Sequence, residues 1–400
     1  MGETTMNKKF KVASIFLGLM LLSAGVMAGC GSLSESSESV DPSGSIVLEA
    51  TEVKNVILFI GDGMGPEQVK FGEIIKENKL SFQEFPYSTT VNTNSLDGLG
   101  GYTTTDSAAA ATALATGVLT TNGRVGLGPE REAPLETIMD FAQTLGKRTG
   151  VITTEGLNGA TPMGFSSHAV DRSLGRNLLE EAAKTSGINF FASDATDDLN
   201  CFTKAGYSVI SGLDMYDVVK EDEKIFCNMM IKAGVEEDNE TYETFHETVA
   251  TALDFLSQDE DGFVLMAEGA HIDHGGHNND IDYMVEELLA FDQGVEAALE
   301  WAKGRTDTVI IVTADHETGD LHLRDGITKY NYRDMETANG FEYETLYYYW
   351  GTTGHSDAHV GFYVNGKDIK FNRYSQFNDE SLIKNTDVFI IMKDFLENKI

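Results

Sequence analysis

Several strongly apolar runs in this sequence end directly in carboxylate or imidazole side chains. The three clearest runs are Asn55–Ile60, Phe263–Ala267 and Thr308–Thr313. The candidate ligands that follow them are Asp62, Glu268, Asp273, His277, Asp315 and His316. Continuous apolar runs of this length are typical of strands that are buried on both faces, as in parallel sheets. Because the carboxyl ends of parallel strands meet at one edge of a sheet, we expect these side chains to lie close together.

The segments between these runs have the patterns of helices. Tyr283–Lys303 places apolar side chains at helical spacing, and the alanine-rich stretch Ser107–Thr116 favours a helix with Asp106 or Ser107 as its N-cap. Other expected elements are helices from Pro66 onward, over Leu174–Thr185 and over Asp387–Glu397, and strands over Thr149–Thr154 and His359–Val364. Alternating strands and helices predict an α/β fold with a doubly wound, mostly parallel central sheet and helices on both faces. Roughly residues 187–250 form an insertion of mixed pattern.

The N-terminus has the pattern of an export signal. Basic residues precede the apolar run Val12–Ala28, and small residues lead to Cys30. This pattern predicts a signal peptide over 1–29 and lipidation of Cys30; a plain secretory signal or an uncleaved anchor is the alternative. The polar stretch that follows predicts a flexible tether over 30–51 and a catalytic domain over 52–400. No other stretch has the length and apolar character of a membrane span.

The charge of the chain excludes one class of partner. The formal net charge is −35 and the sequence pI is about 4.4, whereas nucleic-acid binding requires basic surface. We therefore expect no nucleic-acid partner, and an acidic surface suits an exported protein. Export also permits a disulfide between Cys201 and Cys227, although two separate thiols remain an equal alternative.

Each candidate ligand has an ordinary explanation when it is taken alone. The glycines around Asp62 are typical of a turn, and a serine such as Ser107 at a helix start is usually an N-cap. Asp273 and His277 are four residues apart and could share a helix face, but the glycines between them favour a turn. Taken together, carboxylates and imidazoles suit a divalent metal cluster, and a serine beside them suits a nucleophile. The set predicts a metallohydrolase.

The sequence resembles the alkaline phosphatase family. The resemblance is carried by GDGMG at 61–65, TDSAAAATALATG at 105–117, ATP at 160–162 with Arg172 downstream, EGAHIDHGGH at 268–277, TADH at 313–316, and His355. These motifs occur in the order typical of the family and span about residues 52–365.

The resemblance implies a role for each matching residue. Ser107 is implied as the nucleophile that becomes phosphoserine, and Arg172 as the residue that binds the phosphate. The implied ligands of one Zn²⁺ are Asp273, His277 and His355, and those of a second are Asp62, Asp315 and His316, with Ser107 also touching it. A third ion, normally Mg²⁺, is implied at Asp62, Thr161 and Glu268. Two zinc ions roughly 4 Å apart would hold the attacking and leaving oxygens of an in-line displacement.

Some positions depart from the family pattern. Gly159 stands where bacterial members often carry Asp and animal members His, and His274 stands where some bacterial members carry Lys. Both are expected to act on the third metal and bound phosphate through water, as neighbours of the ligands, and Asp106 adjoins Ser107. The identity of the third metal stays open at this point. Only 38 residues separate His316 from His355, which predicts a small insertion there and a compact member of the family.

The expected activity is metal-dependent hydrolysis of phosphate monoesters to an alcohol and inorganic phosphate. The protein is expected to be lipid-anchored at the outer face of the cytoplasmic membrane, and homodimers are an expectation because relatives often form them. A phosphodiesterase on the same scaffold is an alternative, although such enzymes usually lack the arginine that matches Arg172. A non-catalytic lipoprotein that captures metal or phosphate is a second alternative. It predicts loss of the nucleophile or of a ligand, and neither is lost.

Overall fold

The computed structural model of the protein describes residues 52–130, 133–194, 199–229, 231–232, 243–337, 340–374 and 382–400. The expected signal peptide, Cys30 and the tether up to residue 51 lie outside the described residues. Among the helices within the described ranges, none combines the length and the apolar character needed to cross a membrane.

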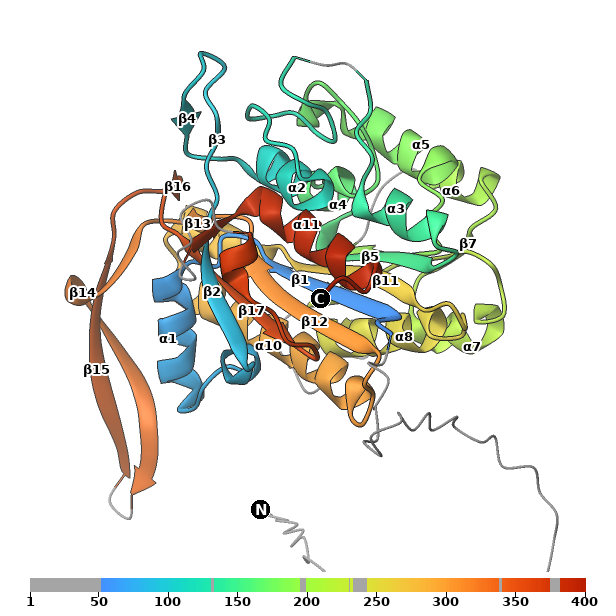
Figure 1. Ribbon diagram of the computed structural model, residues 1–400. Coiled ribbons are helices and arrows are strands. Elements are labelled where there is room, and N and C mark those ends of the chain that lie inside the picture. The colour runs from blue at the N-terminus through green and yellow to red at the C-terminus, as the bar shows by residue number, and fades with distance from the viewer. Residues whose placement is uncertain are drawn as a thin grey trace, which may run out of the picture. The chain divides into compact units, whose positions relative to one another are not determined.

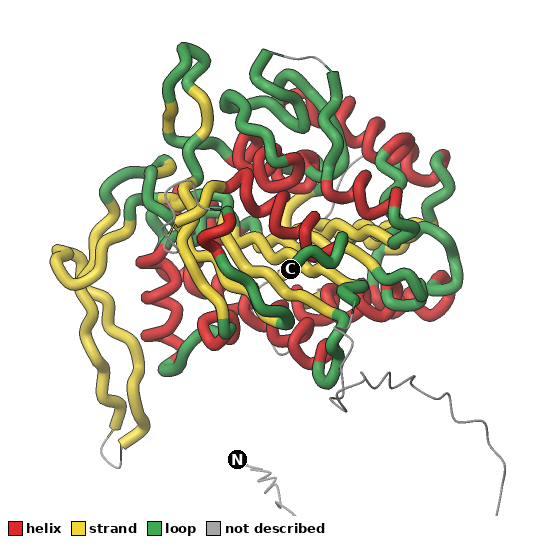
Figure 2. The backbone as a smooth tube through the Cα atoms, in the orientation of Figure 1, coloured by secondary structure: helices red, strands yellow, loops and turns green. Residues whose placement is uncertain are grey.

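A ten-stranded sheet forms the centre of the described part of the chain (Figures 1 and 2). From one edge to the other, its strands are β18 (Leu382–Lys384), β2 (Tyr87–Asn92), β17 (Val360–Asn365), β12 (Thr308–Ala314), β1 (Asn55–Gly61), β11 (Phe263–Gly269), β5 (Arg148–Gly156), β6 (Phe190–Asp194), β8 (Ile225–Asn228) and β7 (Ser208–Ile210). Only β17 pairs antiparallel with its neighbours within this sheet. The predicted doubly wound, mostly parallel sheet is therefore confirmed.

Helices cover both faces of the sheet (Figure 1). One face carries α2 (Ser107–Thr116), α3 (Ile138–Thr144), α4 (Ala160–Gly164), α5 (Gly175–Thr185) and α11 (Asn385–Leu396). The other carries α1 (Pro66–Lys76), α8 (Phe245–Leu256) and α10 (Ile281–Ala302). Each predicted helix and strand is present within a few residues of its expected bounds.

The central strands are held in place by a dense aromatic core. Every residue of β1, β11 and β12 is buried. Phe59 of β1 meets Phe245 of α8 and Phe291 of α10 edge to face, with ring centroids 6.4 and 6.0 Å apart. Truncation of a buried phenylalanine of this kind to alanine costs about 3–5 kcal/mol. The carboxyl ends of these strands are consequently a rigid support for the side chains that follow them.

The insertion of mixed pattern contributes to the main sheet. It supplies β6, β7 and β8, together with the helices α6 (Asn200–Lys204), η3 (Leu213–Met215) and α7 (Tyr216–Val219) and the short strands β9 (Ile231–Lys232) and β10 (Glu243–Thr244). Cys227 in β8 is a buried thiol, and Cys201 in α6 is a partly buried thiol with its sulfur 3.9 Å from the Leu179 carbonyl oxygen. The structure thus favours two separate thiols over a disulfide.

A long hairpin lies between the segments that carry His316 and His355. Its strands are β14 (Leu321–Thr337) and β15 (Gly340–Trp350), which project from the body of the molecule (Figure 1). Tyr348 is buried and its ring lies 6.5 Å from that of Phe71 in α1. The aromatic end of β15 is therefore packing material that fixes the base of the hairpin. The remaining short elements are β3 (Ser95–Leu96), β4 (Tyr102–Thr103), β13 (Glu317–Thr318), β16 (His355–Ser356), α9 (His271–Asn278), η1 (Ser81–Glu84), η2 (Arg172–Leu174) and η4 (Phe371–Arg373).

Candidate metal centre

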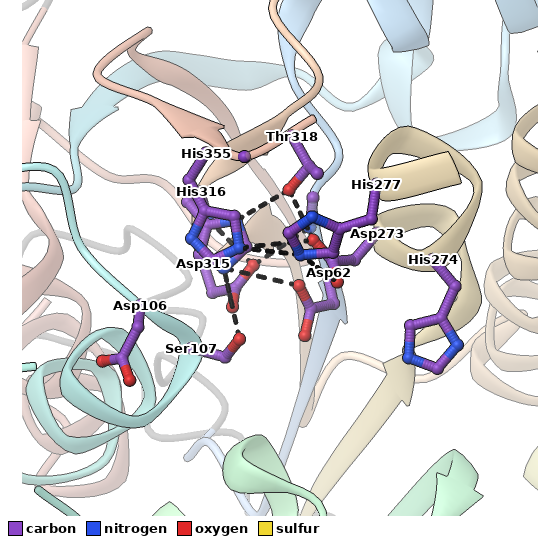
Figure 3. Close-up of polar contacts among 12 residues, drawn as sticks. Asp62, Asp106, Ser107, Asp273, His274, His277, Asp315, His316, Thr318 and His355 are labelled. Atoms are coloured by element: carbon purple, nitrogen blue, oxygen red, sulfur yellow. Dashed lines mark hydrogen bonds and ion pairs between the residues drawn. The ribbon is translucent and has the colours of Figure 1, made fainter. Parts of the chain in front are cut away.

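Three adjacent strands deliver carboxylates to one place. Asp62 directly follows β1, Glu268 lies near the end of β11, and Asp315 directly follows β12. The parallel register pairs Ile60 with both Glu268 and Thr313, so the three strand ends are level. Figure 3 shows Asp62 and Asp315 pointing toward the same cluster of histidines. The predicted meeting of these side chains is observed.

Asp273 and His277 lie on a helix. The turn that was predicted from the two glycines between them is therefore wrong. The segment His271–Asn278 forms α9, and Asp273 Oδ2 lies 3.3 Å from His277 Nε2 one turn later. Close packing explains why position 275 is a glycine. A Cβ at Gly275 would lie 2.6 Å from the backbone of Met284 in α10. Four-residue spacing on this helix thus directs both side chains to one point.

Asp62, Asp315 and His316 form one group of candidate ligands. His316 Nε2 lies 3.5 Å from Asp62 Oδ1 and 3.2 Å from Asp315 Oδ2. The Thr318 hydroxyl donates to Asp273 Oδ1 at 2.5 Å, so its oxygen is left to accept from His316 Nδ1 at 3.2 Å. This places the proton of a neutral His316 on Nδ1 and the lone pair of Nε2 toward the two carboxylates. Such an arrangement is suited to a metal ion.

Asp273, His277 and His355 form a second group. The nitrogens His277 Nε2 and His355 Nε2 lie 3.2 Å apart, and His355 Nε2 lies 3.6 Å from Asp273 Oδ1. The other ring nitrogen of each histidine faces a backbone carbonyl, of Thr353 for His277 at 2.6 Å and of Thr105 for His355 at 2.8 Å. Carbonyls accept only from N–H, so both Nε2 atoms are free to bind a cation through their lone pairs.

The two groups are contiguous. The His316 and His355 rings stack with centroids 3.6 Å apart, and Asp273, His316 and His355 also offer ligand atoms that all lie within 4.8 Å of one another. Asp62, Asp315 and His316 meet the same criterion. His316 therefore stands between two positions for metal ions.

The buried carboxylates of this centre favour the binding of cations. Burial, followed by the charges of neighbouring carboxylates, raises the pKa of Asp62 well above its usual value. Burial and the charge of Asp273 raise the pKa of Asp315 to about 7. Burial and the proximity of His355 hold the pKa of His316 well below its usual value, so its ring stays neutral. Carboxylates that resist ionisation until a positive charge arrives, beside the neutral imidazole of His316, are a typical metal-binding environment.

His277 and Asp273 are an ion pair when no metal intervenes. The hydrogen bond with Asp273 raises the pKa of His277 to about 9. Burial would raise the pKa of Asp273, but the hydrogen bond with His277 and the nearby His316 hold it well below its usual range. A bound cation would replace the proton on His277 Nε2.

Ser107 lies over these ligands at the start of α2. Its Oγ is 3.3 Å from His316 Nε2, and the side chain is buried (Figure 3). Asp106 is the N-cap: its carboxylate accepts from the amides of Ala109 at 3.0 Å and Gly123 at 2.9 Å. Arg172 Nη1 lies 3.6 Å from Asp106 Oδ2, and the arginine is 41% exposed. Arg172 is therefore held next to the serine while its guanidinium can still reach a ligand.

Glu268 and Thr161 carry buried oxygens whose bonding capacity is unused. Glu268 Oε2 accepts from the Thr153 hydroxyl at 2.5 Å. By contrast, Glu268 Oε1, Thr161 Oγ1, Asp62 Oδ1 and Asp315 Oδ2 are buried without a hydrogen-bond partner among the described residues. A buried oxygen that makes no hydrogen bond lowers the stability of the fold unless a bound group interacts with it. The residues present thus fit a divalent cation both here and at the imidazoles.

The two positions noted as departures lie at the margin of this centre. Gly159 is the N-cap residue of α4, the helix that carries Thr161. His274 is 44% exposed and lies apart from the cluster of imidazoles in Figure 3; its Nε2 is 3.9 Å from Glu155 Oε2.

Sequence patterns did not single out several residues that hold the ligands. Thr318 orients both Asp273 and His316, and Thr153 holds Glu268. Thr318 follows His316 by two residues and Thr153 lies in a predicted strand, but a threonine in either place has many ordinary explanations. Glu155 at the end of β5 was also missed. Among the remaining histidines, His168 is structural: its ring bridges Glu181 at 2.8 Å and the Leu135 carbonyl at 3.0 Å.

Comparison with known proteins agrees with this geometry. The family model described as alkaline phosphatase matches residues 53–205 and 217–387. The chain is 30% identical over 348 residues to alkaline phosphatase 3 of Bacillus subtilis, covering 80% of this chain and 72% of that protein. It is 31% identical to the repressible alkaline phosphatase of Saccharomyces cerevisiae, covering 67% and 55% of the two chains.

Solved structures give the same result. The structure of alkaline phosphatase from the Antarctic bacterium TAB5 superposes with a TM-score of 0.71 at 25% identity, covering 87% of this chain and 99% of that one. The family model spans most of this chain, and its match includes every candidate ligand described above. The chain therefore belongs to the alkaline phosphatase family.

Proposed function

We propose that this protein hydrolyses phosphate monoesters to an alcohol and inorganic phosphate through a phosphoserine at Ser107. The observation that carries the proposal is the position of the Ser107 hydroxyl, 3.3 Å from His316 Nε2 and directly over two groups of candidate metal ligands. The nitrogen next to this hydroxyl, His316 Nε2, lies in turn 3.5 Å from Asp62 Oδ1 and 3.2 Å from Asp315 Oδ2. Ser107 Oγ attacks phosphorus as the P–O bond to the alcohol breaks, and the alcohol leaves with a proton. Water then attacks the phosphoserine, which releases inorganic phosphate and restores the Ser107 hydroxyl.

The residues around Ser107 position the substrate. The start of α2 presents backbone N–H groups that favour an anion. The Asp106 carboxylate fixes the loop at Gly123 and lies next to the guanidinium of Arg172. The planar fork of Arg172 can then hold two phosphate oxygens. This geometry favours a monoester, whose terminal phosphate oxygens are free to take up such contacts.

The ligand groups favour two zinc ions and one magnesium ion. Asp273, His277 and His355 would hold one zinc, and Asp62, Asp315 and His316 the other, because mixed imidazole and carboxylate donors suit Zn²⁺. Asp62, Thr161 and Glu268 would hold Mg²⁺, which prefers oxygen. When bound, these ions supply the positive charge that lowers the pKa of a hydroxyl or water and stabilises the leaving oxygen.

We further infer an exported protein that Cys30 anchors to the outer face of the cytoplasmic membrane and that forms homodimers. The signal-like sequence before Cys30 supports the anchor. Mass spectrometry of the mature N-terminus should find a diacylglyceryl-modified Cys30, and Cys30→Ser should release active protein from the membrane fraction. An unmodified N-terminus elsewhere would contradict the anchor, and light scattering decides the oligomeric state.

The activity is tested with Ser107→Ala. Removing the nucleophile should lower kcat for an aryl phosphate monoester at least about 10³-fold while two zinc ions per chain remain bound. Thr116→Val is a matched control, because its hydroxyl donates to the Thr112 carbonyl at the opposite end of α2. Full turnover by Ser107→Ala would contradict the proposal. Faster cleavage of an aryl phosphate diester than of the monoester by the unmodified protein would favour a phosphodiesterase.

A further inference from the structure

The side chain of Glu155 fills the space beside Gly159. A Cβ atom at Gly159 would lie only 1.8 Å from Glu155 Oε1, far inside van der Waals contact. Glu155 in this conformation and any side chain at position 159 therefore exclude one another. A carboxylate from four residues earlier in the chain takes the place that a side chain at 159 would occupy.

Hydrogen bonds through Thr153 link the backbone of Glu155 to Glu268. Glu155 follows Thr153 by two residues at the end of β5, where the pairing with β6 is irregular. The Thr153 hydroxyl accepts from the Glu155 amide at 3.2 Å and donates to Glu268 Oε2 at 2.5 Å. In the parallel register, Thr153 is the direct partner of Glu268. Glu155 consequently lies one step further toward the carboxyl edge of the sheet, where the metal centre is.

The electrostatic effects show the same proximity. After burial, the charge of Glu155 is the main influence that raises the pKa of Glu268, and Glu155 also acts on Asp62. The groups of opposite charge that face Glu155 are His271 and Arg172, and His274 Nε2 lies 3.9 Å from its Oε2. Glu155 is 24% exposed. Glu155 therefore lies near enough to Asp62 and Glu268 for the three carboxylates to repel one another, and a cation can relieve that repulsion.

Buried oxygens without partners line this point. Asp62 is 5% exposed, Thr161 and Glu268 are 0% exposed, and one oxygen of each lacks a hydrogen-bond partner among the described residues. No imidazole is needed to complete this set, because all of its atoms are oxygens. Sets of oxygen ligands suit Mg²⁺, whereas Zn²⁺ is more often bound by nitrogen or sulfur.

We propose that Glu155 is part of the third cation site, where its carboxylate supplies the oxygen that Gly159 cannot and favours Mg²⁺ over Zn²⁺. The inference rests on the proposed function, because it assumes that the imidazole groups hold zinc. The roles of Glu155 and Gly159 depend on each other. The Glu155 carboxylate can reach the site from β5 because Gly159 has no side chain in that space.

The test measures Mg²⁺ binding rather than activity. Zinc-loaded protein is titrated with MgCl₂ by isothermal titration calorimetry, and bound metals are counted by elemental mass spectrometry. Glu155→Gln keeps the shape of the side chain and removes its charge. It should weaken Mg²⁺ at least tenfold, within the 10- to 100-fold range typical of residues that support a metal site, and should leave two zinc ions per chain. Glu181→Gln is the control, since Glu181 is similarly exposed at 31% and pairs with His168.

A double variant tests the link to Gly159. Glu155→Ala combined with Gly159→Asp moves the carboxylate to position 159 and should restore Mg²⁺ affinity to within about threefold of the unmodified protein. Gly159→Asp alone should weaken Mg²⁺, because the two side chains overlap. If Glu155→Gln also loses zinc, the double variant decides: recovery of Mg²⁺ binding supports the inference, and its absence overturns it.

Two results overturn this inference while leaving the proposed function intact. One is unchanged Mg²⁺ affinity in Glu155→Gln with both zinc ions bound. The other is tighter binding of inorganic phosphate with unchanged Mg²⁺ affinity, which would make Glu155 only a counter-charge for Arg172. Failure of the unmodified protein to take up zinc and to hydrolyse an aryl phosphate is a different result and would overturn the proposed function itself.

Discussion

The imidazole half of the metal centre and its oxygen half are held in different ways. The imidazole half comprises Asp273, His277, Asp315, His316 and His355, and the oxygen half comprises Asp62, Glu155, Thr161 and Glu268. In the imidazole half, each ring nitrogen that does not face the cluster is bonded to a carbonyl or a hydroxyl, so the direction of every lone pair is set. In the oxygen half, Asp62 Oδ1, Thr161 Oγ1 and Glu268 Oε1 have no hydrogen-bond partner among the described residues, whereas in the imidazole half Asp315 Oδ2 is the one such atom among the described residues.

The two halves depend on bound metal to different degrees. The imidazole half can satisfy itself with protons, as the pairing of His277 with Asp273 illustrates. The oxygen half has three carboxylates but only one side-chain hydroxyl of its own, on Thr161, and its carboxylates repel one another. We therefore expect the imidazole half to be organised before metal binds, whereas the oxygen half becomes fully satisfied only with a cation.

The largest effect is expected from loss of an imidazole ligand. His316→Ala removes the one side chain that belongs to both groups of residues able to hold a metal ion among those described, the groups for which zinc is proposed. It should lower zinc content from two ions to at most one and reduce kcat/KM for an aryl phosphate by at least about 10³-fold, as removal of a metal that activates the nucleophile would. His322→Ala is the control, because His322 is 42% exposed on the hairpin. Retention of two zinc ions by His316→Ala would contradict the division into two halves.

A smaller effect is expected from a residue that only orients the imidazole half. Thr318→Val keeps the shape of the side chain and removes hydrogen bonds to Asp273 and His316. Zinc affinity, measured by competition with a chelating dye, should fall about 10- to 100-fold while Mg²⁺ affinity changes little. Equal losses of both metals would show that the halves are not separable.

The stability of metal-free protein should fall as pH rises. The pKa of Asp315 is raised to about 7, so between its usual value near 3.8 and pH 7 the folded state holds a proton that the unfolded state has lost. The pKa of His277 is raised to about 9, so its contribution is full below pH 6.5 and is lost as pH rises through 9. Both groups therefore destabilise the metal-free protein with rising pH. His316, whose pKa is held well below its usual value, acts in the opposite direction only below about pH 6.5. The gap in Tm between zinc-loaded and chelator-treated protein should therefore widen from pH 6.5 to pH 9, and a constant gap over that range would contradict this assignment of charges.

The smallest effect is expected from support of the oxygen half. Thr153→Val removes the hydrogen bond to Glu268 and the acceptor of the Glu155 amide. Mg²⁺ affinity should fall by a few-fold, because the carboxylates keep their charge and only their orientation loosens. Zinc content should stay at two ions per chain, and calorimetry checks both values. A loss of zinc in this variant would place Thr153 in the imidazole half.

Most of the fold follows from patterns that one sequence displays. The buried runs at β1, β11 and β12 and the alanine-rich α2 have strong local signals, and their order predicts the sheet. The glycines of α9 misled the prediction because a helix glycine looks like a turn unless its packing partner is known. Gly275 is needed for the approach of α10, a contact that no local pattern reveals.

The candidate ligands were predictable because they follow strand ends in motifs, whereas their supports were not. Thr318 and Thr153 act through hydrogen bonds across the site, and a threonine carries no signal of such a role. The possible role of Glu155 can be recognised only from its contact with Gly159 in the structure. In a sequence, a glutamate near a strand end is usually a solvated surface residue. Three-dimensional neighbours, rather than sequence neighbours, define this part of the site.

The proposed phosphoserine can be trapped and located. Zinc-loaded protein is incubated with inorganic phosphate at mildly acidic pH, quenched in acid, digested and mapped by mass spectrometry. We expect a phosphoryl group on Ser107 in the unmodified protein and none in Ser107→Ala or in chelator-treated protein. Phosphate on another residue, or steady turnover with no labelled Ser107 under any of these conditions, would contradict this expectation.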